Sequence, residues 1–170
     1  MKPIILLTLF LLSISNFYSQ NPDWEKRLEF NHLEIIGKCI ANERELPNTT
    51  VYVYENDTLV YSFKTPFRKD FSIPLPLNTE ITIVFEKNGF VSKKIFIDTH
   101  TTYPEDNYNS IAMDIEMLPF KKDVDYSALE NPVTIIKYNL ETFSFEFDKE
   151  YSIKMLEEQN KIVNQMYVSK

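Results

Sequence analysis

The stretch from residue 33 to residue 99 is the feature that most constrains the fold of this chain. Apolar and polar residues alternate there in short runs, each bounded by Asn, Asp, Pro or Gly. Successive side chains of a strand point to opposite faces, so this alternation predicts strands with one buried face. Short strands with regular turn signals predict a small, mainly β sandwich or barrel. The runs are LEIIGKCIA, TVYVYE, TLVYSFK, DFSIPL, EITIVFE and FVSKKIFID.

Three positions in these runs make sharper predictions. Gly37 lies in the middle of a strand, where Gly is unfavourable, and it predicts a bulge or the close approach of another backbone. Pro74 assigns its run to an edge strand, because Pro has no backbone N–H to donate to a neighbour. Asn56-Asp57, between two alternating runs, predicts a tight hairpin.

The first 20 residues have the pattern of a secretory signal peptide. Lys2 is followed by an apolar run over residues 4–12, and the small residues Ser15 and Ser19 come after it. The run is shorter than the roughly 20 residues of a membrane-spanning helix, which favours removal over the alternative, an anchor. We therefore expect export to the periplasm, outer membrane or exterior, with no membrane insertion after cleavage.

Charge and cysteine content exclude some classes of partner. The chain has 25 acidic against 18 basic residues, a net charge of −7, which disfavours nucleic acid and anionic lipid as partners. Cys39 is the single cysteine and has no partner for a disulfide within the chain. It is either a buried, inert thiol or a reactive or metal-binding one.

The order of the predicted strands resembles the carboxypeptidase regulatory-like domain. The matching features are an opening strand with Ile35-Ile36-Gly37, a Leu46-Pro47 pair before a V-x-V strand, an F-x-I-x-L strand at residues 71–75, and Gly89-Phe90 after an apolar strand. The resemblance covers about 65 residues. It implies an Ig-like or prealbumin-like (transthyretin-like) antiparallel β-sandwich, as found in secreted bacterial envelope proteins.

The resemblance also implies an accessory or interaction role, because the chemistry of the carboxypeptidases belongs to a separate zinc domain. The family often has Gly in its first turn and in the loop before the F-x-I strand. This chain has Glu43-Arg44 and Arg68-Lys69 at those places. These loops are therefore predicted to differ in shape from those of the family.

The segment after residue 118 has a different pattern. It predicts a β-hairpin over VTIIKYN and FSFEF, followed by an amphipathic helix that begins after Asp148 as its N-cap. We accordingly divide the chain into a signal peptide at 1–20, a lead-in segment at 21–32, a sandwich at 33–118, and a hairpin with a C-terminal helix at 119–170. In the lead-in, Trp24 and Leu28 are spaced to pack against the sandwich, although an exposed, docking Trp is the alternative.

No motif predicts catalysis, a metal or another cofactor. His32 and His100 are the only histidines and lack a zinc-hydrolase context, and no G-x-S-x-G or Gly-rich phosphate loop is present. Acidic residues at 98, 105, 106, 114 and 116 match no calcium loop and favour a solvated rim. We therefore expect a protein that is not an enzyme.

Two binding roles remain from the sequence. The first is an interaction module that docks on another envelope protein through a sheet edge or through the C-terminal helix, although an amphipathic helix of this kind is more often part of the core. The second is a small glycan-binding protein with a platform of exposed tyrosines, which cross-strand packing explains equally well. The candidate surface residues are Tyr52, Tyr54, Tyr61, Tyr103, Tyr108, Met155, Ile162 and Met166.

Overall fold

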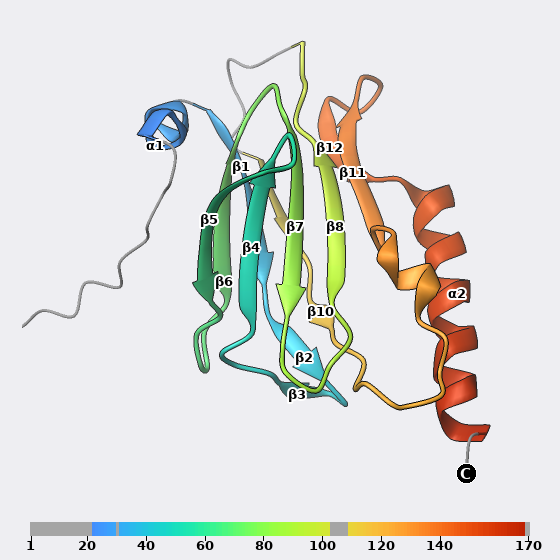
Figure 1. Cartoon of the computed structure of the whole chain (residues 1–170). Helices are drawn as coiled ribbons and strands as arrows, with labels where there is room; N and C mark the ends of the chain where they lie inside the picture. The colour runs from blue at the N-terminus through green and yellow to red at the C-terminus, as the bar shows by residue number, and fades with distance from the viewer. Residues whose placement is uncertain (1–21, 30, 103–108, 169–170) are drawn as a thin grey trace, which may run out of the picture.

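The computed structural model describes residues 22–29, 31–102 and 109–168, and it shows two β-layers with a helix along one open side (Figure 1). The predicted signal peptide lies outside these residues. The elements are α1 (Pro22–Leu28), β1 (His32–Gly37), β2 (Cys39–Ala41), β3 (Arg44–Glu45), β4 (Thr50–Glu55), β5 (Thr58–Lys64), β6 (Phe71–Pro76), β7 (Glu80–Glu86), β8 (Lys93–Asp98), β9 (Asn109–Ala112), β10 (Ile115–Glu116), the 3-10 helix η1 (Ser127–Glu130), β11 (Thr134–Asn139), β12 (Ser144–Phe147) and α2 (Lys149–Val168). The mainly β fold with a C-terminal helix is the predicted one.

One layer is a six-stranded sheet in the order β12-β11-β8-β7-β4-β5. Its hairpin between β4 and β5 turns at Asn56 and Asp57, which both have positive φ, as the sequence predicts. The C-terminal hairpin does not stand apart from this sheet. β11 pairs with β8 in parallel, with Thr134 opposite Ile95, so the hairpin extends the sheet on one side.

The other layer consists of two three-stranded sheets, β6-β1-β9 and β10-β2-β3. They follow each other directly, because β1 leads into β2 and β9 into β10. β9 and β10 pair in parallel with β1 and β2, so this sandwich is not purely antiparallel. β6, which contains Pro74, lies at the edge of its sheet, as the sequence predicts.

At Gly37 the backbone of the β1–β2 strand lies very close to that of the β9–β10 strand. The carbonyl oxygen of Met113 would lie 1.8 Å from a β-carbon at this position. The ladder is irregular at the same place, because the Lys38 N–H donates to the Asp114 carboxylate rather than to a backbone carbonyl. The predicted close approach at Gly37 is thus confirmed.

The core lies between the two layers and follows the predicted alternation. Leu33 and Ile35 of β1 and Cys39 of β2 are buried. Of the two alternatives for Cys39, the buried thiol is therefore the one that the structure shows. The other strands contribute apolar side chains from one face each, among them Val51, Val53, Phe71, Ile73, Leu75, Ile81, Ile83, Phe85, Ile95 and Ile97.

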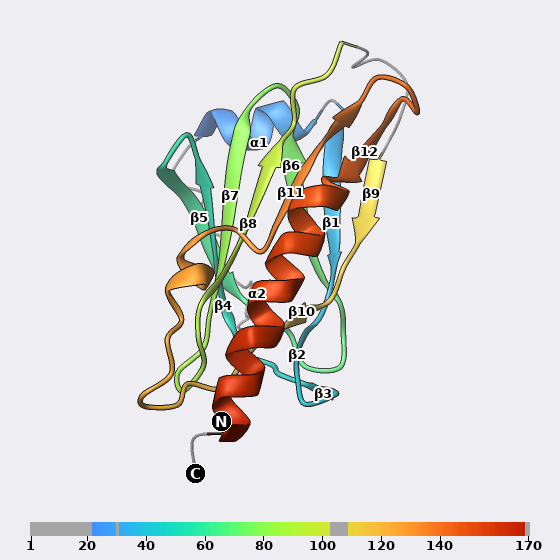
Figure 2. The same ribbon diagram turned by 90° about the vertical axis from the view of Figure 1, so that its right-hand side faces the viewer.

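The two helices cover different openings of the sandwich. Trp24 of α1 is buried against Tyr61, with ring centroids 5.7 Å apart, so it is a packing residue and not a docking one. α2 begins directly after Asp148, whose carboxylate accepts the Tyr151 N–H as the predicted N-cap. Figure 2 shows α2 crossing the side of the sandwich between β8–β11 and β9–β10.

Candidate binding groove

The prediction of a partner-binding surface on α2 is wrong, because the residues named for it lie in the interior of the protein. Met155, Ile162 and Met166 are all buried. They form a second, smaller core together with Leu118 and Leu129. Their spacing at one face of α2 therefore reflects docking of the helix onto its own chain, which satisfies that apolar face without a partner.

The structure contradicts one member of the predicted tyrosine platform and does not describe two others. Tyr61 has only 6% of its surface exposed, because its ring packs inward between Trp24 and Phe63. Tyr52 and Tyr54 are half-buried on β4. The other two predicted members, Tyr103 and Tyr108, lie outside the described residues. The described residues thus provide no continuous row of exposed tyrosine rings.

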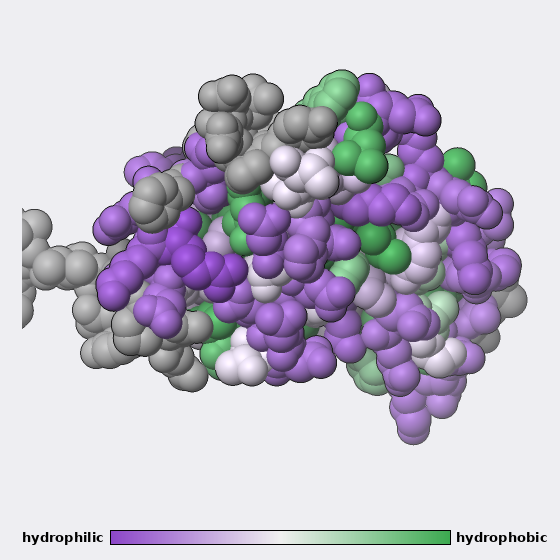
Figure 3. Space-filling view, turned by 90° about the horizontal axis from the view of Figure 1, so that it is seen from above, coloured by the Kyte–Doolittle hydropathy of each residue, from purple (hydrophilic) through white to green (hydrophobic). Residues whose placement is uncertain are grey.

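A different part of α2 presents apolar side chains to solvent. Ile153 and Leu156 have 60% and 57% of their surface exposed, and Phe147, just before the helix, is also exposed. Other exposed apolar residues include Phe67 and Phe120, and Leu140 and Phe143 in the turn between β11 and β12. On the face seen from above, green apolar patches are separated by purple hydrophilic residues (Figure 3).

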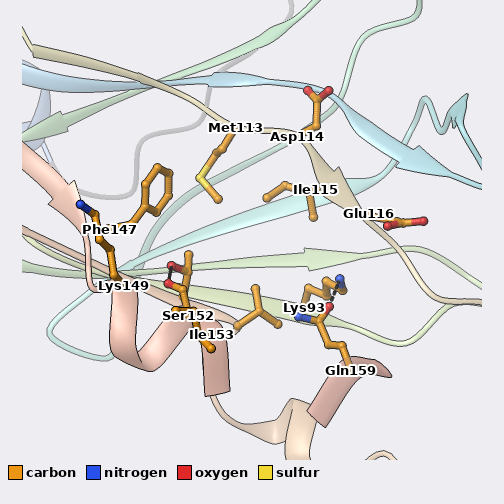
Figure 4. A pocket seen from close by; sticks show the side chains of 12 residues that line it. Lys93, Met113, Asp114, Ile115, Glu116, Phe147, Lys149, Ser152, Ile153 and Gln159 are labelled. Atoms are coloured by element: carbon orange, nitrogen blue, oxygen red, sulfur yellow. Dashed lines mark hydrogen bonds between the residues drawn. The ribbon is translucent and has the colours of Figure 1, made fainter. Parts of the chain in front are cut away.

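A groove of about 470 Å³ lies beside these exposed residues. α2 forms one wall with Ile153 and Gln159, and the β9–β10 region forms the other with Met113 and Ile115 (Figure 4). Its volume is within the range of ligand sites in proteins, roughly 300–1,000 Å³. The remaining lining residues are Lys93, Asp114, Glu116, Val133, Thr134, Phe147, Lys149 and Ser152.

Lys93 is the charged group inside the groove. It starts β8 on the inward-facing side, and only 5% of its surface is exposed. Its ammonium donates a hydrogen bond to the side-chain oxygen of Gln159 at 2.5 Å, which connects the sheet to α2. Beside it, the hydroxyls of Thr134 and Ser152 lie 2.7 Å apart and make a second polar link.

Burial changes the titration of this lysine. Removal of its ammonium from water lowers the pKa of Lys93 to about 8, while the negative charge of Glu116 acts in the opposite direction. No carboxylate of the described residues forms an ion pair with it. A lysine held this way binds an anion when charged, and it is a nucleophile when neutral.

Lys93 was not among the predicted site residues, although the sequence contains a signal for it. Lys93, Ile95 and Ile97 occupy alternate positions of β8, so their side chains point to the same face of the strand, and both isoleucines are buried there. A lysine at an inward position of an alternating strand departs from the pattern, and such departures tend to mark functional positions. The partner Gln159 had no comparable signal, because its contact depends on where α2 docks.

Of the groups that were considered for chemistry in the sequence, Asp114 and Glu116 line the groove, whereas the two histidines do not. His100 is exposed and its Nδ1 lies 2.6 Å from the Asp98 carboxylate, and neither it nor His32 lines the groove. Within the described ranges, His, Cys, Asp and Glu side chains form no group of three or more that could hold a metal ion. None of the described helices is long and apolar enough to cross a membrane.

The fold is a two-layer β-sandwich with a groove beside its C-terminal helix, and it is similar to several solved structures. A C-terminal fragment of the pilus adhesin SpaC from Lactobacillus rhamnosus GG is 8% identical, with a TM-score of 0.37 over 53% of this chain and 46% of that one. The 3-chlorocatechol 1,2-dioxygenase from Rhodococcus opacus 1CP is 10% identical, with a TM-score of 0.43 over 69% and 70%. S.CueP is 15% identical, with a TM-score of 0.36 over 53% and 64%.

These likenesses concern the arrangement of strands and carry no property of those proteins to this chain. The chain spans less than half of the adhesin fragment. No family model matches the sequence, and no curated protein does. The β-sandwich predicted from the family resemblance is present, whereas membership of the carboxypeptidase regulatory-like family has no such support.

One prediction from the sequence is corrected by these comparisons. We expected a protein that is not an enzyme, but one of the structural neighbours is an enzyme, the dioxygenase. The expectation that this chain is not an enzyme is therefore withdrawn.

Proposed function

We propose that this chain is an exported accessory module of the bacterial cell envelope, with a sandwich of the carboxypeptidase regulatory-like type, and that it binds another envelope protein through the groove between α2 and β10. The proposal of export rests on the signal-peptide pattern of the first 20 residues. The observation that supports binding is the groove itself, where exposed apolar side chains surround a buried lysine.

The groove combines two features that a docking site requires. Two apolar side chains of the groove lining, Phe147 and Ile153, stay exposed in the folded chain, and their burial by a partner is favourable. The polar groups at the floor, Lys93 and Gln159, restrict which partner fits. The glycan-binding alternative receives less support, because Tyr61 is inside the core.

Site-specific photocrosslinking tests this function. A benzoylphenylalanine at Ile153 places the crosslinker at the groove, and the same residue at Leu140 is a matched control, because Leu140 is equally exposed in the turn between β11 and β12. In envelopes of the native organism, we expect one discrete crosslinked protein from position 153 and none from position 140. Equal crosslinking from both positions, or none from 153, contradicts the proposal.

A further inference from the structure

The free side of the β9–β10 strand faces the groove at residues 113–116. On the other side, the N–H groups of Met113, Ile115 and Met117 donate to carbonyl oxygens of the β1–β2 strand at 2.8–2.9 Å. Successive backbone groups of a strand point to alternate sides, so those of Asp114 and Glu116 point away from β1–β2. In the described part of the chain, β9 and β10 are edge strands.

Asp114 shows that the groove is bordered there by backbone. Its carboxylate turns away from the cavity in Figure 4 and accepts the Lys38 N–H at 3.0 Å. The residue nevertheless lines the groove. An edge with unpaired N–H and C=O groups is a template for one more strand. The groove therefore offers main-chain hydrogen bonds as well as apolar contacts.

Lys93 determines which side chain such a strand should carry. A buried charge is costly unless an opposite charge compensates it, and within the described residues the ammonium of Lys93 is hydrogen-bonded to the neutral Gln159 amide. One carboxylate from a partner would compensate the ammonium. The carboxylate of Glu116 at the rim would repel further acidic groups, whereas Met113, Ile115 and Ile153 favour apolar neighbours.

We propose that the occupant of the groove is an extended peptide segment of the partner, which adds a strand to the β9–β10 edge and places a single Asp or Glu side chain, flanked by apolar residues, against Lys93. This inference rests on the proposed function and specifies the partner chemistry. Main-chain pairing provides affinity in this mode of recognition, and the alternate side chains provide specificity.

The test uses a display library of random hexapeptides, selected on the wild-type chain. We expect enrichment of sequences with one acidic residue between apolar ones. The enriched peptide is then synthesised with Glu, with Gln in place of Glu, and with N-methylation of its central amides, and each form is titrated by calorimetry. The Gln form should bind about tenfold more weakly, and the N-methylated form should not bind.

Two variants assign the effect to Lys93. In Lys93→Met, which keeps the volume of the side chain, the Glu and Gln forms should bind within about twofold of each other. In Glu116→Gln the Glu form should bind more tightly, because a repelling charge is gone. Circular dichroism verifies that both variants fold.

Several outcomes would overturn the inference. They are a selection without acidic preference, a Glu-to-Gln ratio that persists in Lys93→Met, and undiminished binding of the N-methylated peptide. Preference for decanoate over every peptide would also overturn it, since the occupant would then be a small carboxylate. If crosslinking from Ile153 succeeds while the peptides show no acidic preference, the inference alone fails. If crosslinking from Ile153 also fails, the proposed function fails with it.

Discussion

A β-carbon on Gly37 would lie 1.8 Å from the carbonyl oxygen of Met113, a separation that no pair of non-bonded atoms tolerates. The obstacle is backbone, so relief requires that the β9–β10 strand moves away from β1–β2. We expect Gly37→Ala to lower the free energy of unfolding by about 3 kcal/mol or more, measured by urea denaturation.

Gly89→Ala is the matched control for this prediction. Gly89 has a φ of +82° and open space around it, so an added methyl group costs only backbone strain of about 1–2 kcal/mol. Equal losses for the two variants would mean that the approach of Met113 to Gly37 is not tight.

Lys93 should make stability depend on alkaline pH. Its pKa lies at about 8 in the folded chain because of burial, below the ordinary value of 10.5. Unfolding therefore takes up a proton between these two pH values, and the free energy of unfolding rises as the pH increases from 8 to 10.5. The full effect has an upper limit of about 3 kcal/mol.

Lys93→Met removes this penalty. The variant should be more stable than the wild type at pH 7, and its denaturation midpoint should lose the rise between pH 8 and 10.5. Lys154→Met, at an exposed position of α2, is the control and should leave both properties unchanged. A wild-type curve that stays flat over this range would show that Lys93 titrates normally.

Glu43 occupies a position that suits glycine. It has a φ of 62°, next to Asn42 with 49°, in the turn from β2 to β3. Asn-Gly is the favoured sequence for such a two-residue turn. Glu43→Gly should therefore raise the thermal midpoint, by a gain of about 1 kcal/mol, whereas Glu43→Ala should bring no gain because it keeps the β-carbon. A gain with alanine would point to charge instead of backbone strain.

Cys39 should be unreactive until the chain unfolds. Removal from solvent raises the pKa of its thiol to about 12, and the thiolate is the reactive form. At pH 8, we expect no colour with Ellman's reagent from the native chain and complete reaction in urea. A cysteine at exposed position 141, in Glu141→Cys, should react at once and serves as the positive control. Rapid reaction of Cys39 in the native chain would contradict its burial.

Local patterns predicted the strands well because each reflects a local physical requirement. Leu33, Ile35 and Cys39 are inward because alternation is a property of the single strand. Gly37 and the N-cap Asp148 were identified from the cost that other residues would incur at those positions. Such reasoning does not account for Arg68. It adopts a positive φ of 59° at a place where the carboxypeptidase regulatory-like domains often have Gly.

The pairing of distant segments was not predictable in this way. Nothing in the sequence around Thr134 indicates that it lies opposite Ile95 in parallel. The groove arises from such pairings, since Lys93, Ile115 and Gln159 come from three separate parts of the chain. The α2 residues predicted to bind a partner, Met155, Ile162 and Met166, face the interior instead, because the docking side of a helix depends on the sheet it meets.

The parallel pairing of Leu33 with Asn109 has a consequence for how the protein is made. A nascent chain presents its first strand long before the strand that flanks it has been synthesised, and contacts of such long range close slowly. Until about residue 117 has emerged, one of the two layers is incomplete. The polypeptide therefore lacks a complete sandwich for most of its synthesis.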